Sequence, residues 1–429
     1  MSGGPLHAAL VVVVLGAIAG LGAGLLTLLL YGVERLALGF VETSSQPGPF
    51  LVEPWRRIVS VVAGACLAAV AWWLLRSRAK KVPSVAGAVS GERMPIWQTV
   101  THVCLQILIV GCGSSIGREV APRELGAMLG QRFGDLLHVD DPGRRRTIVA
   151  IAAAAGLAGV YDAPFAGLFF ATEILLTDAS AVTAAMALGA SSVAAFVAAL
   201  IKGHRVFYDI SGLSPTFTPT LMLFALLAGA VFGMAGAAFR IASRRATSRR
   251  PRGAGILWMM PAAALVTGLV AIKVPQVMGN GRASAQLAMS MLSSSQSVRT
   301  VAAVAAVTFL AKALVTLMTL RSGASGGVLQ PGIALGVSLG TLLGCGWTLL
   351  VPGDSMAACA VMGGAALLAA SQQAPLMAMC LVLELVDAPM SLVVPVGLAV
   401  AVSFLVSKRI ESGWLRRERK AAPPVPSER

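Results

Sequence analysis

The stretch GSSIGREVAPRELGAMLG, from Gly113 to Gly130, carries four charged residues among glycines in a chain that is otherwise strongly apolar. A second stretch, SGASGGVLQPGIALGVSLGTLLG from Ser322 to Gly344, repeats its order of features. In each, a turn rich in glycine and serine leads to a proline, Pro122 or Pro331, and glycines then recur at every fourth position. Glycines at this spacing form a face that packs closely on another helix in lipid. Both stretches therefore predict a turn followed by a tightly packed membrane helix.

The likeness between the two regions continues downstream. DAPFAGLFFATE has Pro164 and Glu173 nine residues apart, and QAPLMAMCLVLE has Pro375 and Glu384 at the same spacing. Self-similarity of this kind indicates a duplicated architecture. We expect two related halves and a short basic cytoplasmic tail, at residues 1–215, 216–408 and 409–429.

Composition predicts an integral membrane protein. Of 429 residues, 56% are hydrophobic and 12% are charged, whereas ordinary soluble domains are about 25% charged. Mean hydropathy is +0.80. A helix that crosses a bilayer needs about 20 apolar residues, and some apolar stretches are too long for one crossing and others too short. We expect an all-α, multi-pass fold with paired, broken and re-entrant helices, from apolar stretches at 8–39, 58–76, 97–112, 145–160, 164–201, 219–243, 254–275, 300–320, 332–351, 355–371 and 376–407.

The net charge of +15 is gathered in short basic runs between apolar stretches. Basic loops stay on the cytoplasmic side of a membrane. We expect a multi-pass protein of a bacterial-type inner (plasma) membrane. A nucleic-acid partner is not favoured, because no soluble domain exists to present a basic face. The runs are Arg76–Lys81, Arg144–Arg146, Arg244–Arg252 and Arg416–Lys420.

Two broken helices at matching positions of related halves indicate a transport site near the bilayer midplane. Each helix N-terminus offers unpaired N–H groups and the positive end of a dipole, which suits an anion. Glu119 then becomes an internal competitor: its ionised carboxylate occupies the anion position, and protonation or an incoming anion vacates it. The alternative is that Glu119 only pairs with Arg118 or Arg123 in a structural network.

These motifs resemble those of the CLC family of chloride channels and proton/chloride antiporters. GREVAP, from Gly117 to Pro122, is similar to the family's GREGP, and SGASGGVLQP resembles SGAPGGIFAP. DAPFAGLFFATE resembles the NAP-rich helix that ends in glutamate. The likeness covers about residues 55 to 410. It implies a CLC-like inverted repeat and a homodimer with one pore in each subunit.

Carried over by this resemblance, Glu119 matches the gating glutamate, so that voltage or pH would act through its occupancy and protonation. The implied anion-binding positions are the backbone of Gly117, Arg118 and Val120, the amides of Val328 and Leu329, and Lys80, which aligns with a pore serine of the GSGIP motif. Chloride or a similar anion is the expected substrate. Bound chloride ions but no cofactor are expected.

Departures from the family pattern weaken the case for tight proton coupling. Ile174 stands where the family's antiporters keep a second glutamate, and an apolar residue relays no proton. A pore tyrosine near the C-terminus also has no convincing counterpart in KRIESGWL, from Lys408 to Leu415. The sequence therefore favours passive or weakly coupled conduction, with proton/chloride antiport as the alternative.

A remote alternative is an intramembrane serine hydrolase, because GASGG from Gly323 to Gly327 fits a GxSxG pattern around Ser325. That chemistry needs a histidine base after the serine in chain order. The four histidines, at 7, 102, 138 and 204, all precede it. We expect no enzyme, and the scattered histidines predict no metal site.

Overall fold

The computed structural model describes residues 5–204, 206–210, 218–291 and 296–421. The first half contains α1 (Pro5–Ala37), α2 (Pro54–Arg78), α3 (Val85–Val89), α4 (Ile96–Gly111), α5 (Val120–Leu136), α6 (Pro142–Tyr161), α7 (Pro164–Phe169), the π-helix η1 (Phe170–Leu175) and α8 (Ala181–Lys202). The second half contains α9 (Pro219–Ser248), α10 (Ile256–Lys273), α11 (Arg282–Ser290), α12 (Val298–Arg321), α13 (Leu329–Leu350), α14 (Met356–Gln372), α15 (Pro375–Leu385) and α16 (Val393–Ala421). Short 3₁₀ turns lie at η2 (Gly253–Gly255), η3 (Pro275–Val277) and η5 (Met390–Leu392).

The fold is the all-helical membrane architecture that the sequence predicts. Within the described residues, 8 helices are long and apolar enough to cross a membrane. Shorter apolar helices, including α4, α14 and α15, lie between them. This mixture of long and short helices confirms the expected combination of full crossings and partial ones.

Two of the longest apolar stretches split, as their length requires. The stretch 164–201 divides into α7 with η1 and then α8, whose first turn is capped by the Ser180 hydroxyl accepting from the Thr183 amide at 3.2 Å. The stretch 376–407 divides into α15 and α16 around Asp387, which takes the left-handed conformation with φ of 48°. Polar turn residues in both places end one helix and begin the next.

The internal repeat is visible in backbone geometry. The C-cap of α6 is Asp162, with φ of 53°, and the C-cap of α14 is Gln373, with φ of 60°. Each is followed by an alanine and then by the proline that starts the next helix, α7 or α15. A left-handed residue ends a helix by redirecting the chain. The two halves therefore use the same device at corresponding positions.

The glycine faces pack as predicted, with α5 on α6 and α13 on α14. A Cβ on Gly126 would lie 2.3 Å from the Ala152 carbonyl oxygen, and one on Gly336 would lie 2.3 Å from the Gly363 oxygen. No side chain fits at such separations, so glycine is what allows these helix backbones to approach.

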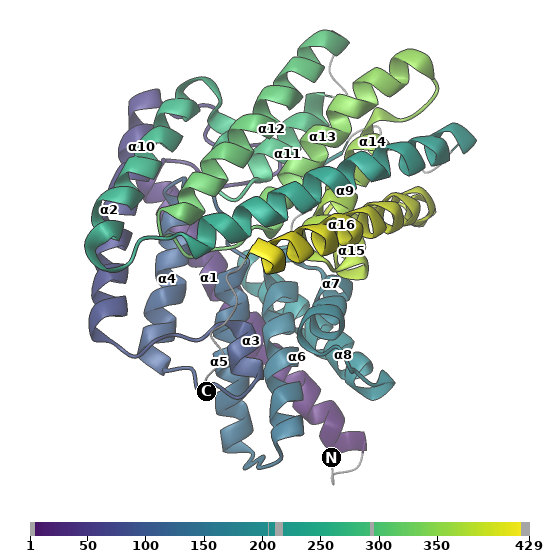
Figure 1. The fold of residues 1–429 in the computed structure, drawn as a ribbon. Coiled ribbons are helices and arrows are strands. Elements are labelled where there is room, and N and C mark those ends of the chain that lie inside the picture. Colours follow the sequence, from purple (N-terminus) through teal and green to yellow (C-terminus); the bar gives the residue numbers. More distant parts are fainter. Residues whose placement is uncertain (1–4, 205, 211–217, 292–295, 422–429) are drawn as a thin grey trace.

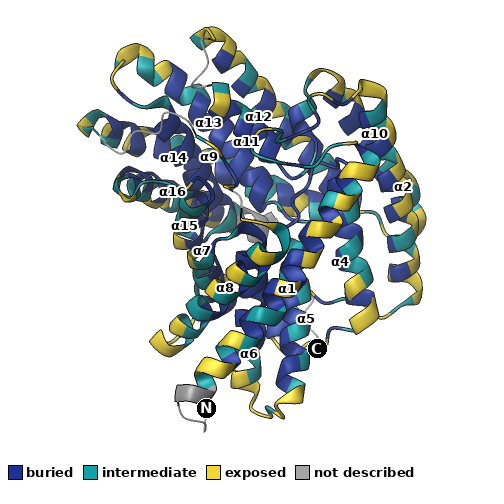
Figure 2. Ribbon diagram, turned by 180° about the vertical axis from the view of Figure 1, so that it is seen from behind, coloured by how far each residue is buried: buried dark blue, intermediate teal, exposed yellow. Residues whose placement is uncertain are grey.

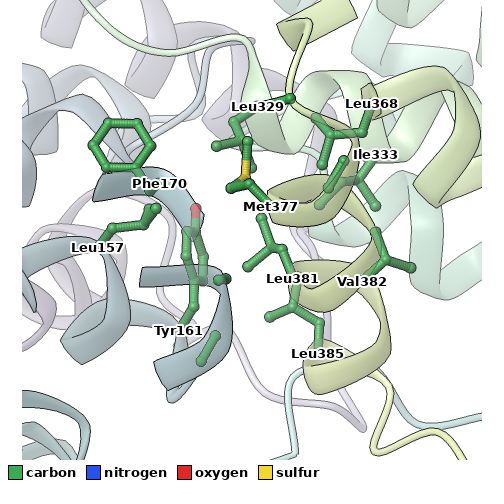
Figure 3. Close-up of a cluster of buried hydrophobic side chains, with 14 of the residues drawn as sticks. Leu157, Tyr161, Phe170, Leu329, Ile333, Leu368, Met377, Leu381, Val382 and Leu385 are labelled. Carbon is green, nitrogen blue, oxygen red and sulfur yellow. The ribbon is translucent and has the colours of Figure 1, made fainter. Parts of the chain in front are cut away.

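The two halves lie against each other, with α2 of the first half beside α10 of the second (Figure 1). Likewise, α15 of the second half packs against α7 of the first. Buried residues gather at the centre of the molecule, and exposed ones lie on the outer turns of the peripheral helices (Figure 2). In Figure 3, Leu157, Tyr161 and Phe170 of the first half face Leu329, Met377 and Leu381 of the second. The shared core lies where the halves meet.

The division into residues 1–215, 216–408 and 409–429 stays a prediction. The expected junction at 215 and 216 falls within 211–217, outside the described residues. The expected start of the tail at 409 lies inside α16, which continues to Ala421. The helix persists because Glu411 anchors it to α9: its Oε1 accepts from Arg240 Nε at 3.2 Å and Arg244 Nη1 at 2.6 Å.

Candidate anion-binding site

The two turns that precede α5 and α13 meet at the centre of the fold. Gly117 and Gly327 form an isolated antiparallel bridge, in which each amide donates to the other's carbonyl at 2.8 Å. Segments more than 200 residues apart are therefore held backbone to backbone. The helix N-termini of both halves converge on one point, as the duplicated motif predicts.

Glu119 occupies this point. It precedes the first residue of α5, and none of its surface is exposed. Its carboxylate Oε1 accepts a hydrogen bond from the Leu329 amide at 2.6 Å, at the first residue of α13. The N-terminus of a helix favours a negative charge through its free N–H groups and its dipole. A carboxylate of the first half thus occupies the N-terminus of a helix of the second half.

The bridging glycines are required by the Glu119 side chain. A Cβ on Gly117 would lie 2.0 Å from Glu119 Oε2, and one on Gly327 would lie 1.9 Å from Oε1. Neither glycine has a positive φ. The constraint here is therefore the space beside the carboxylate and not the conformation of the backbone.

The alternative that Glu119 only forms an ion pair with a neighbouring arginine is not what the geometry shows. Arg123 Nε donates to the Glu119 backbone carbonyl at 2.7 Å and stacks over Phe170 with 5.0 Å to the ring centroid. Arg118 lies 5.8 Å from the ring centroids of both Tyr161 and Phe207. Among the described residues, no salt bridge reaches the Glu119 carboxylate. The carboxylate is held by a helix N-terminus.

The other predicted anion-binding residues are distributed unevenly around Glu119. The Leu329 amide is engaged with the carboxylate, whereas the Gly117 amide is committed to Gly327. Val120 is the first residue of α5, and Val328 is the N-cap of α13. Arg118 is buried beside Glu119, and its Nε and Nη1 make no hydrogen bond within the part of the chain that the structure describes.

Lys80 lies apart from this cluster in the loop between α2 and α3. Its side chain is exposed, and no hydrogen bond or ion pair of it occurs among the described contacts. An anion contact of Lys80 therefore remains a prediction from the sequence alignment.

Sequence reasoning missed three residues near the meeting point of the halves. They are Gly327, which bridges to Gly117, and the side chains of Tyr161 and Gln330. Tyr161 and Gln330 are both buried, and Gln330 Oε1 accepts from the Tyr208 hydroxyl at 2.8 Å. The Tyr161 hydroxyl is directed into the space between the halves (Figure 3). Gly327 could have been found from the GG pair ahead of α13, but the other two are contributed by contacts between distant segments.

The second pair of repeat glutamates has a clear structural role. Glu173 accepts from the Leu376 and Met377 amides at 3.1 and 2.8 Å, at the N-terminus of α15. Reciprocally, Glu384 accepts from the Phe165 and Ala166 amides, both at 2.8 Å, at the N-terminus of α7. Each half thus caps a helix of the other.

Ser325 behaves as a turn residue. Arg76 donates from Nη2 to the Ser325 hydroxyl and from Nη1 to the Gly323 carbonyl, both at 2.9 Å. No group of three or more His, Cys, Asp or Glu side chains is placed to hold a metal ion in the described ranges.

Comparisons of this chain with a family model and with individual known proteins agree on one family. A family model described as voltage gated chloride channel matches residues 64–408. The chain is 28% identical over 439 residues to the H(+)/Cl(-) exchange transporter ClcA of Klebsiella pneumoniae (strain 342), covering 96% of this chain and 89% of that protein. It is 29% identical over 405 residues to the protein of the same name from Citrobacter koseri, covering 89% and 82%. These names are of transporters and not of hydrolases.

Solved structures share the fold. A slow cyanobacterial Cl⁻/H⁺ antiporter superposes with a TM-score of 0.78 at 20% identity and covers 94% of both chains. A CLC-type fluoride/proton antiporter superposes with a TM-score of 0.69 at 21% identity, covering 94% of this chain and 96% of its own.

Proposed function

Because the chain belongs to the voltage gated chloride channel family, we propose that it moves chloride or a similar anion across the bilayer past Glu119, in exchange for protons. The observation that carries the proposal is the bond between the Glu119 carboxylate and the Leu329 amide, at the junction of the two halves. It places a titratable negative group on a helix N-terminus suited to an anion.

The geometry suggests how anion and proton movement are linked. An ionised Glu119 and a free anion compete for the same N–H group, so both do not occupy it together. Protonation removes the negative charge and replaces a charge-assisted hydrogen bond with a weaker neutral one. The carboxylic acid then leaves the position more readily. Each departure of Glu119 couples anion entry to proton uptake.

Two candidate functions differ in this coupling. The sequence favours passive or weakly coupled conduction, but the relatives named as exchangers support its alternative, proton/chloride exchange, better. The observation that favours passive conduction is Ile174, an apolar and partly exposed side chain where the family's antiporters keep a glutamate. Proton-coupled exchange is the first candidate and passive conduction the second.

Liposomes that contain the purified protein distinguish the two. Under a chloride gradient with no pH gradient, an exchanger drives protons uphill and acidifies or alkalises the lumen. Passive conduction moves chloride and leaves the lumenal pH unchanged once the membrane potential is clamped. Absence of chloride movement, both with and without a clamped membrane potential, would refute the proposed function.

Glu119→Gln tests the central residue. Glutamine has nearly the same shape and cannot ionise, so we expect altered gating and loss of the pH dependence of chloride flux, with assembly intact by size-exclusion chromatography. Unchanged flux and pH response would remove Glu119 from the mechanism.

The proposal extends to a homodimer in an inner membrane with its basic runs in the cytoplasm. Gly117, Glu119, Gly327 and Leu329 all come from a single chain, which supports a complete pore in each subunit. Light scattering in detergent gives the subunit number, and co-reconstitution of wild-type with Glu119→Gln subunits tests whether the two pores work independently.

A further inference from the structure

A row of four side chains reaches α5 at Glu124, five residues after Glu119. The Trp72 indole Nε1 of α2 donates to His102 Nδ1 of α4 at 3.0 Å. His102 Nε2 lies 3.6 Å from Glu124 Oε2 of α5, and Gln106 Nε2 donates to the same oxygen at 2.6 Å. The row joins three helices and ends at a carboxylate five residues beyond Glu119, a rise of about 7.5 Å along a helix.

The Glu124 carboxylate is buried without a strong base against it. Its side chain is 9% exposed, and the neighbouring His102 side chain is 14% exposed. Among the described residues, no lysine or arginine lies within salt-bridge distance of it. Burying an unpaired carboxylate is unfavourable for the charged form. Such a group gains from binding a proton.

Trp72 fixes the form of His102. Because the indole N–H can only donate, Nδ1 must accept, and the ring proton of neutral His102 is therefore on Nε2, facing Glu124. A doubly protonated ring would lose its bond to Trp72. The charged groups that face this ring are Arg76 on α2 and Arg250 in the basic run Arg244–Arg252. His102 is thus a neutral donor that positions the carboxylate.

The Gln106 amide can hydrogen-bond to Glu124 in both its ionised and its protonated form. Its Nε2 donates to the carboxylate, while its buried Oε1 has no partner among the described residues. An ionised carboxylate needs donors, and a protonated one needs an acceptor for its O–H. Rotation of the amide by half a turn brings the unused Oε1 to Glu124. An orphaned buried acceptor beside an unpaired carboxylate is the expected trace of such a site.

We propose that Glu124 is a second proton-binding site, on the cytoplasmic side of Glu119, with His102 and Gln106 as its positioning residues. The carboxylate takes a proton from water to become a neutral acid, and releases it again; His102 stays neutral throughout. Arg76 and Arg250 belong to the basic runs assigned to the cytoplasm. On its own element, Arg123 is the adjacent charge. The inference rests on the proposed exchange, in which it supplies the proton site that Ile174 does not.

Infrared difference spectra of the whole protein in lipid, recorded between pH about 5 and about 8, test proton binding without transport. We expect a carboxylic acid C=O band that appears at the lower pH and is missing in Glu124→Gln. Glu53→Gln, at an exposed glutamate, is the matched control and keeps the band. A wild-type spectrum identical to that of Glu124→Gln overturns the proposal.

Transport provides the second readout. Glu124→Gln is expected to lower proton flux roughly 100-fold while chloride flux stays of the same order, and Glu124→Asp is expected to restore part of the proton flux. Trp72→Phe frees Nδ1 and shifts the pH profile of proton flux. Wild-type coupling in Glu124→Gln would refute the assignment. If the wild type moves no protons, the proposed exchange fails, and the infrared titration alone decides whether Glu124 binds one.

Discussion

The replacement Gly327→Ala probes whether the Glu119 carboxylate occupies an anion position. The added Cβ would lie 1.9 Å from Oε1 and 2.2 Å from Cδ of Glu119. Restoring an ordinary carbon to oxygen separation of about 3.5 Å moves the carboxylate by roughly 1.6 Å. Its bond to the Leu329 amide, now 2.6 Å, then exceeds hydrogen-bond distance.

The energetic effect follows from the loss of that bond. A hydrogen bond to a charged group contributes about 1.5–3 kcal/mol, which corresponds to a roughly 10- to 150-fold fall in the occupancy of the glutamate-bound state. Since the backbone at Gly327 suits alanine, the substitution acts through the carboxylate. We expect chloride affinity to lose most of its dependence on pH, because the titratable competitor has already left.

Calorimetric titration of chloride at two pH values measures this directly. Gly346→Ala is the control, since a Cβ at that position in α13 meets nothing within 4 Å. In a Glu119→Gln background, Gly327→Ala should change the pH dependence no further. If Gly327→Ala alone binds chloride with the affinity and pH dependence of the wild type, Glu119 does not rest at an anion position.

Two further predictions concern the reciprocal caps and the basic loop. Glu384→Gln weakens the cap on α7, and the free energy of unfolding should fall by about 1.5–3 kcal/mol; thermal unfolding in detergent measures it, and an unchanged midpoint would show that the cap is not stabilising. Lys80→Met should lower chloride affinity at low ionic strength, with the difference fading as salt screens the exposed charge; equal affinities at low salt would place Lys80 in a loop without a role at the pore.

Much of the fold was predictable because the bilayer restricts a chain of this composition to helices. The duplicated turn, proline and glycine pattern located both central turns and Glu119. It also predicted the helix faces at Gly126 and Gly336, since a four-residue glycine spacing has few uses other than close packing.

What the sequence did not reveal depends on contacts between distant segments. The bridge from Gly117 to Gly327 forms only when the two halves pack together. The same packing brings Tyr161 and Gln330 to the place where the halves meet. The extension of α16 past 408 was missed because a polar stretch such as 409–421 looks like a tail until Glu411 is seen against two arginines of α9. Hydropathy alone carries no signal for that anchor.

The exchange of caps between Glu173 and Glu384 has a consequence for biosynthesis. The amides at the start of α7 are capped by the carboxylate of Glu384, which is translated more than 200 residues later. Until Glu384 has been made, the amides of Phe165 and Ala166 lack this cap. The cap on α7 can therefore form only after Glu384 has been synthesised, and a chain truncated before this residue lacks that cap.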